Sequence, residues 1–144
     1  MSEPLVMSIS RSATKPVDLC EKRGTGAVLD FSQASLIIVE EMADEASRWE
    51  PKLTTDKFTN LVQNIGCYLL EVGRREFGGG YLWHNSRDQP VLVVGEPIYH
   101  VALMTWDKAR GRLTGNRADN LPFFYDGFAE KVRHAAPGTR TLYG

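Results

Sequence analysis

The stretch EFGGGYLWHNSRDQPVLVVG, residues 76–95, decides how this chain folds. Its three consecutive glycines separate a segment with helical periodicity from a run that alternates and then becomes wholly apolar. A phosphate-binding loop needs a strand before the glycines and a helix after them, because the amides of the helix N-terminus bind the anion. Here the order is reversed, and Arg74 and Arg75 are the cations expected in a last helical turn. We therefore predict that the glycines end a helix and lead into a sheet.

The residues after the glycines predict a small antiparallel sheet. YLWH, residues 81–84, and PVLVVG, residues 90–95, form a predicted hairpin around the polar turn NSRD. The continuous Val and Leu run of the second strand predicts burial on both of its faces. PIYHV, residues 97–101, is the expected third strand.

Two helices are predicted before the sheet. Ser32 is a suitable N-cap for a helix from Gln33 to Arg48, which Pro51 is expected to end. Thr54 or Thr55 is a suitable cap for the next helix, which runs to the glycines. The apolar residues of the first helix recur at helical spacing and predict its buried side: Leu36, Val39, Met42, Ala43, Ala46 and Trp49.

Two further helices are predicted after the sheet, over residues 102–113 and 121–136, the second capped by Asn120. Helices on both sides of a small sheet indicate an α+β domain: two N-terminal helices, about three antiparallel strands, then two C-terminal helices. We expect a single domain over residues 27–136. Residues 1–26 are predicted to be a loosely ordered arm with an edge strand around Met7, and residues 137–144 a flexible tail.

Composition narrows the functional classes. The net charge of -1 is divided unevenly: residues 1–72 carry seven Lys and Arg against eleven Asp and Glu, and residues 73–144 carry ten against seven. This layout argues against a general nucleic-acid binder, which has one strongly basic face. Cys20 and Cys67 are too few for a disulfide framework and favour a reducing compartment. With no signal-peptide core and no membrane span, we expect a soluble cytoplasmic protein.

No residue pattern predicts catalysis. Cys67 falls in the middle of a predicted helix, where nothing lowers the pKa of its thiol. His84, His100 and His134 lack the spacing of metal ligands. We therefore predict no catalytic residue set, no metal and no cofactor.

Two charged clusters and two tryptophans are the candidate binding residues. The acidic cluster follows one face of the first helix and is expected to stay in water. The basic cluster surrounds two glycines and suits phosphate, an acidic partner, or simply a solvated loop. Exposed tryptophans are frequent interface anchors. The predicted partner-binding residues are Glu40, Glu41, Asp44, Glu45, Trp83, Trp106, Lys108, Arg110 and Arg112.

Four stretches carry a resemblance: LDFSQASLIIVEEM (29–42), IGCYLLEVGRREFGGGYLWH (65–84), PVLVV (90–94) and RLTGNRADNLPFFYDGF (112–128). Their order resembles that of small, largely uncharacterised bacterial domains found near polymorphic toxins or secretion systems, some of which look like cytoplasmic immunity proteins. The resemblance covers about Leu29 to Val132. It implies a binder rather than an enzyme and brings no catalytic residues. Such families often carry an adjacent Lys-Arg pair where this chain has Ala109 between Lys108 and Arg110.

These observations lead to one main hypothesis and two alternatives. The main hypothesis is a cytoplasmic protein-binding module, an immunity protein that neutralises a toxin or effector by direct binding, with no nucleic acid or membrane as partner. The first alternative is a small ligand-binding domain or enzyme with a cleft between the sheet and the last helix, around Trp83, His100 and Tyr125. The second is a secretion adaptor or structural subunit whose N-terminal arm folds onto a partner.

Overall fold

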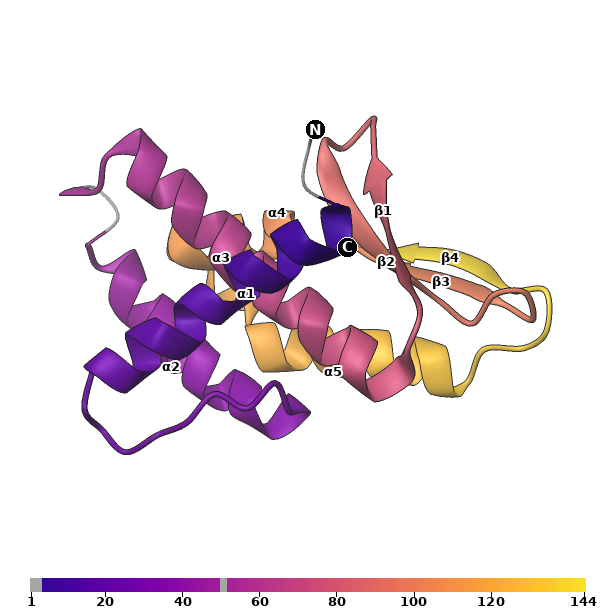
Figure 1. Cartoon of the computed structure of the whole chain (residues 1–144), viewed down its shortest axis with the longest axis horizontal. Coiled ribbons are helices and arrows are strands. Elements are labelled where there is room, and N and C mark those ends of the chain that lie inside the picture. Colours follow the sequence, from indigo (N-terminus) through magenta and orange to yellow (C-terminus); the bar gives the residue numbers. More distant parts are fainter. Residues whose placement is uncertain (1–3, 50–51) are drawn as a thin grey trace.

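The computed structural model describes residues 4–49 and 52–144 and shows an α+β fold (Figure 1). The α-helices are α1 (Leu5–Lys22), α2 (Leu36–Ser47), α3 (Thr55–Phe77), α4 (Trp106–Leu113) and α5 (Leu121–Arg133). The strands are β1 (Gly80–His84), β2 (Gln89–Val94), β3 (His100–Leu103) and β4 (Arg140–Tyr143). Short 3₁₀ turns, η1 (Gln33–Ser35) and η3 (Arg117–Asp119), precede α2 and α5.

The predicted helix ends are confirmed where local signals specify them. Thr54 Oγ1 accepts a hydrogen bond from the Lys57 amide at 3.2 Å and begins α3. At the other end, Gly78 adopts a φ of 77° and donates its amide to the Arg74 carbonyl at 2.8 Å. Asn120 Oδ1 caps α5 by accepting from the Phe123 amide at 2.9 Å. The triple glycine therefore ends a helix, as the order of elements predicted.

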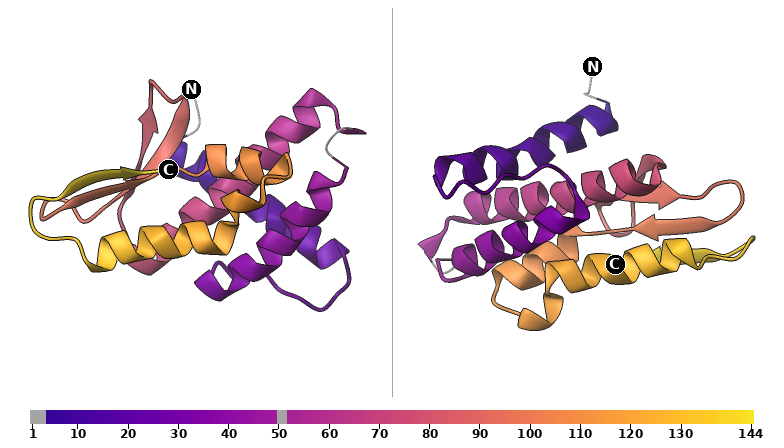
Figure 2. Two further views of the ribbon diagram at one scale, coloured as in Figure 1. Left: turned by 180° about the vertical axis from the view of Figure 1, so that it is seen from behind. Right: turned by 90° about the horizontal axis from the view of Figure 1, so that it is seen from below.

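The N-terminal segment differs from its prediction. Residues expected to be loosely ordered, with an edge strand around Met7, form the 18-residue helix α1 instead. Ile9, Ala13, Pro16 and Cys20 are buried on one side of it, and α1 packs along α3 (Figure 2). Their spacing of three and four residues is helical, whereas the strand prediction considered only the alternation at the start of the segment.

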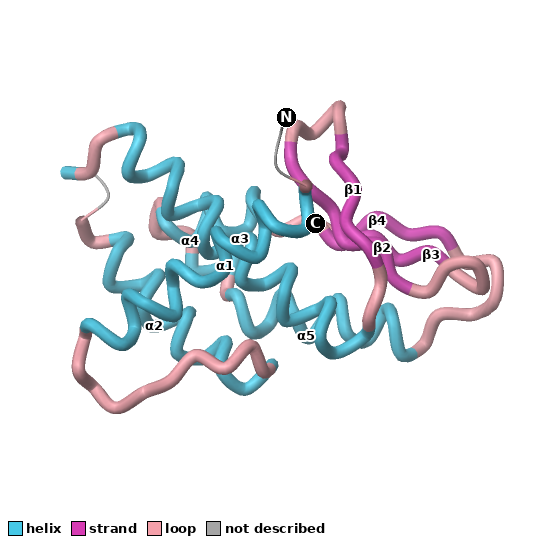
Figure 3. Tube along the Cα trace, in the orientation of Figure 1, coloured by secondary structure: helices cyan, strands magenta, loops and turns pink. Residues whose placement is uncertain are grey.

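The sheet has one strand more than predicted and is mixed rather than antiparallel. Its order is β1-β2-β3-β4: β1, β2 and β3 pair antiparallel, and β4 pairs parallel with β3 (Figure 3). The predicted hairpin is confirmed, with Leu82 opposite Val91. The segment predicted to be a flexible tail contains β4, which is held by bonds such as that from the Met104 amide to the Tyr143 carbonyl at 2.8 Å.

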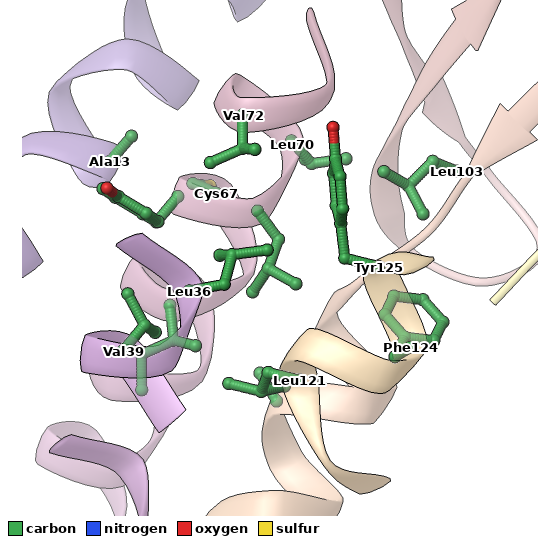
Figure 4. Close-up of a cluster of buried hydrophobic side chains, with 14 of the residues drawn as sticks. Ala13, Leu36, Val39, Cys67, Leu70, Val72, Leu103, Leu121, Phe124 and Tyr125 are labelled. Atoms are coloured by element: carbon green, nitrogen blue, oxygen red, sulfur yellow. The ribbon is translucent and has the colours of Figure 1, made fainter. Parts of the chain in front are cut away.

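The core lies among the helices and extends to the inner face of the sheet, where α3 and α5 pack (Figure 4). Tyr125 is fully buried there together with Leu36, Leu70 and Leu103. Trp49 was predicted to be buried with the first helix but is exposed, because α2 ends at Ser47. Pro51, the residue expected to end that helix, lies outside the described residues.

Candidate functional site

The face of the sheet that points away from α3 and α5 is largely apolar. Side chains alternate along each strand, so pairing places Leu82 beside Val91, Val93 beside Ala102, and Ala102 beside Leu142. Together they line a shallow hollow to which only residues of the four strands contribute among those described. We call this surface the outer face: Leu82, His84, Val91, Val93, His100, Ala102, Arg140 and Leu142.

The two leucines of the outer face, its largest apolar side chains, are open to solvent. Leu82 is 59% exposed and Leu142 is 47% exposed, and they stand on β1 and β4, the two outermost strands. Val91 and Ala102 between them are small and almost covered by their neighbours. The result is an apolar hollow with leucines on opposite sides, a shape that a protruding apolar group of another protein would fill.

The polar groups of the outer face lie at its edges. His100 Nδ1 is 2.5 Å from Glu96 Oε1, and Arg140 Nη1 is 3.5 Å from the same oxygen. At the hairpin end, His84 Nδ1 accepts a hydrogen bond from the Arg87 amide at 3.2 Å. This bond leaves Nε2 as the protonated nitrogen of the neutral ring. The arrangement is an apolar centre with a polar rim, which is typical of protein interfaces.

The predicted tryptophans meet beside the outer face. The Trp83 and Trp106 rings pack edge to face with centroids 6.1 Å apart, and Trp83 remains 42% exposed. The nearby cations have internal partners: Lys108 Nζ is 3.2 Å from Asp119 Oδ1, and Arg110 Nη1 is 3.1 Å from Asp107 Oδ1. Trp83 is therefore the predicted residue of this group whose location best suits an anchor.

The acidic cluster was predicted to stay in water, but two of its residues, Glu40 and Asp44, pair with a buried arginine. Arg112, only 3% exposed, bonds to Glu40 through Nε at 2.5 Å and to Asp44 through Nη2 at 2.6 Å. Glu40 also accepts the Leu121 amide at 3.0 Å, at the start of α5. Three residues of the two predicted binding clusters thus bind one another within the chain. Glu41 and Glu45 are exposed, and Glu45 pairs with Arg23 at 2.8 Å.

The electrostatics of this network follow from its geometry. The hydrogen bond from Arg112 is the main cause that lowers the pKa of the Asp44 carboxyl. Burial acts to lower the pKa of Arg112, but its bonds to Asp44 and Glu40 outweigh burial and raise it. The ionised states of Asp44 and Arg112 are therefore favoured across the neutral range.

A second buried network was missed from the sequence. Glu71, 2% exposed, accepts bonds from Arg74 at 2.7 and 3.0 Å, from Arg75 at 3.3 Å and from Tyr81 Oη at 2.7 Å. It ties α3 to β1 across the triple glycine. A charged residue within the apolar run CYLLEV was the available signal, since a buried charge requires partners.

The three residues around which a cleft was suggested, Trp83, His100 and Tyr125, do not line one common hollow. Trp83 and His100 line the outer hollow, whereas Tyr125 is fully buried and bonds through its hydroxyl to Glu76 at 2.5 Å. Burial raises the pKa of the Cys67 thiol to about 11, which disfavours the thiolate at neutral pH. The described residues form no group of His, Cys, Asp or Glu suited to a metal ion.

No family model, curated protein or solved structure matches this chain. Among the helices described for it, none combines the length and the apolar character that a membrane crossing requires. The geometry of the residues themselves is thus the basis for a functional inference.

Proposed function

We propose that this chain is a protein-binding module and that its partner docks on the outer face of the sheet. One observation carries the proposal: Leu82 and Leu142 expose large apolar surfaces beside a hollow that, among the described residues, is lined by strand residues alone. Large exposed apolar side chains around a hollow with a polar rim are features of interaction sites.

A protein partner fits this face better than a small molecule does. Small-molecule sites are concave and place a few polar groups inside the pocket, where they orient the ligand. The hollow here is shallow, and His100 and Arg140 lie at its edge, where Glu96 engages them. Among the described residues, β4 pairs only with β3, so its other edge presents backbone groups without strand partners beside Leu142.

We further infer that the partner is a toxin or effector encoded beside this chain's gene, which the chain neutralises by covering its active surface. The resemblance to immunity-protein-like domains supports this step. Glu41 and Glu45 lie on α2, at the end of the molecule opposite the sheet (Figure 1), so they would affect the rate of encounter rather than the contact. Charge reversal at both should slow association without abolishing it.

A growth assay tests both parts of the proposal. The product of the adjacent gene is expressed alone and together with this chain, and its toxicity and co-purification are scored. Leu82→Arg with Leu142→Arg should abolish rescue and co-purification, because two charges would have to be buried in an apolar contact. Phe123→Arg, on α5 at a side chain that is 76% exposed, is the matched control and should retain both.

The outcomes separate the two inferences. Equal thermal midpoints for all variants show that folding is intact. If the outer-face variant rescues growth as well as wild type, this face is not the binding surface. If the adjacent product co-purifies in a Leu82- and Leu142-dependent manner but is not toxic, the chain is a binding module of another kind and the immunity proposal fails.

A further inference from the structure

A second apolar hollow lies far from the outer face, between α1, α2 and α3. α1 packs along α3, while α2 packs mainly against α4 and α5, and residues of α1, α2 and α3 together line the hollow; the three helices are labelled in Figure 1. We call the hollow between them the α1–α2 groove. Its apolar lining consists of Pro16, Leu19, Val39, Met42, Ala46, Leu61 and Ile65.

The groove has a buried floor and partly exposed walls. Pro16, Val39 and Ile65 are buried at its base, whereas Met42 and Leu61 are half-buried and Leu19 is exposed. Its volume of about 290 Å³ lies near the lower limit of small-molecule sites. Its lining on α1 runs over residues 15–22, about 11 Å of helix at the usual rise per residue.

The rim of the groove carries an excess of positive charge. Lys15 and Lys22 line it, are exposed, and form no ion pair with any residue that the structure describes. Among the described residues, Asp18 is the only carboxylate of the lining, and Asn64 is its uncharged polar side chain. The next cation along the chain is Arg23, the residue that follows α1, and by contrast it is paired with Glu45 at 2.8 Å. Two uncommitted ammonium groups thus stand over an apolar floor.

We propose that the α1–α2 groove binds a single-chain amphiphile with an anionic head, such as a medium-chain carboxylate. The chain lies on the apolar floor, and the head pairs with Lys15 or Lys22 at the rim. Lysine suits this role because its apolar stem covers the groove wall while its ammonium group remains at the surface. The site is recessed between helices rather than projecting, so the ligand is a free monomer and not a bilayer.

Calorimetric titration of the full chain with decanoate below its micelle concentration tests the proposal. Shortening the ligand from decanoate to octanoate should weaken binding up to about fifteen-fold, since each buried methylene contributes about fourfold. Octanol should bind more weakly than octanoate, because it lacks the charge. Lys15→Gln with Lys22→Gln should weaken decanoate binding by about two- to fivefold per lysine.

Two further variants identify the site. Ala46→Phe, which adds a ring to a residue of the lining, should abolish binding. Arg87→Gln with Lys131→Gln removes the same charge from exposed positions outside the groove and should leave the affinity unchanged. The variant pair at Leu82 and Leu142 should also bind decanoate normally, so a failed partner assay and a failed ligand assay are separable.

Three results would overturn the inference: no heat of binding with decanoate, equal affinities for octanoate and octanol, or decanoate binding that survives Ala46→Phe in a folded protein. Sedimentation with phosphatidylglycerol vesicles is the remaining comparison. Vesicle binding that depends on Lys15 and Lys22, without binding of decanoate, would show that these lysines contact a membrane surface instead.

Discussion

An alanine series through the triple glycine tests the chain reversal between α3 and β1. Gly78 has a φ of 77° and a ψ of -153°, and a Cβ there would meet no atom within 4 Å. Gly79 has a φ of 99°, and its Cβ would lie 2.2 Å from the Val93 carbonyl oxygen. Gly80 does not have a positive φ, and a Cβ added there would meet no atom within 4 Å.

The three positions therefore differ in predicted cost. Gly78→Ala should lower the free energy of unfolding by about 1–3 kcal/mol, the cost of a backbone region that only glycine occupies readily. Gly79→Ala adds a clash with a backbone atom of a paired strand, so its cost should reach at least about 3 kcal/mol. Gly80→Ala should be neutral or stabilise by about 0.4–1 kcal/mol, because alanine restricts the unfolded chain.

Urea unfolding followed by far-ultraviolet circular dichroism measures these differences, with the slope against urea checked for each variant. From the most to the least stable variant, the expected order is Gly80→Ala, Gly78→Ala and Gly79→Ala. A Gly79→Ala variant within 0.5 kcal/mol of Gly80→Ala, a margin typical of neutral surface changes, would refute the close approach of β2 to this turn. It would also show that the glycines are not required for the reversal.

Three further predictions concern buried contacts, each measured by urea unfolding. Ala13→Asp should destabilise by about 3 kcal/mol or more because it buries a carboxylate between α1 and α3, whereas Ser10→Asp on the exposed side should change stability by under about 0.5 kcal/mol. Arg112→Met should cost about 2–3 kcal/mol, less than a fully buried pair, because both carboxylates keep some solvent contact; a loss below about 0.5 kcal/mol would contradict the network. Glu71→Gln should cost about 1–3 kcal/mol at neutral pH. Burial acts to raise the pKa of Glu71, but its bonds to Arg74, Tyr81 and Arg75 outweigh burial and lower the pKa below 4.5. The ionised side chain therefore stabilises the fold above pH 4.5, and this stabilisation is lost as the pH falls through the lowered pKa. An equal difference in stability between Glu71→Gln and wild type at neutral pH and at about pH 3 would contradict this.

The sequence predicts those elements whose signals are local. Thr54 and Asn120 are caps because a side-chain oxygen satisfies an amide three residues on, and the hairpin follows from a polar turn between two apolar runs. Gly78 ends α3 for an equally local reason. None of these features depends on a distant residue, so a single sequence is sufficient to find them.

The elements that were mispredicted depend on distant partners. β4 is only four residues long and becomes a strand because β3 offers it a free edge after α4 and α5 have intervened. α1 contains Pro16 and many polar residues, and its narrow buried side matters only once α3 covers it. In both segments packing overrides weak local preference.

The same limit applies to the candidate site. Alternation along β1 and β2 indicates that one face of each strand is apolar, but whether a helix covers that face is a property of the whole fold. Leu142 belongs to a segment predicted to be a flexible tail, so the outer face could not be assembled from the sequence. Glu40 and Arg112 are 72 residues apart and were predicted as separate binding groups, although each is the other's partner.

The pairing of Glu40 and Asp44 with Arg112 changes how this chain can recognise a partner. If both charged clusters faced solvent, their opposite charges would dominate binding, and affinity would fall steeply with salt. Because Glu40 and Asp44 pair with Arg112 inside the fold, these charges do not contact a partner, and the outer face is an apolar surface with a few charged groups at its rim. Binding through such a face should depend strongly on Leu82 and Leu142 and only weakly on ionic strength, since apolar burial is not screened. A complex whose dissociation constant rose a hundredfold between low and physiological salt would place the contact on the charged surfaces instead.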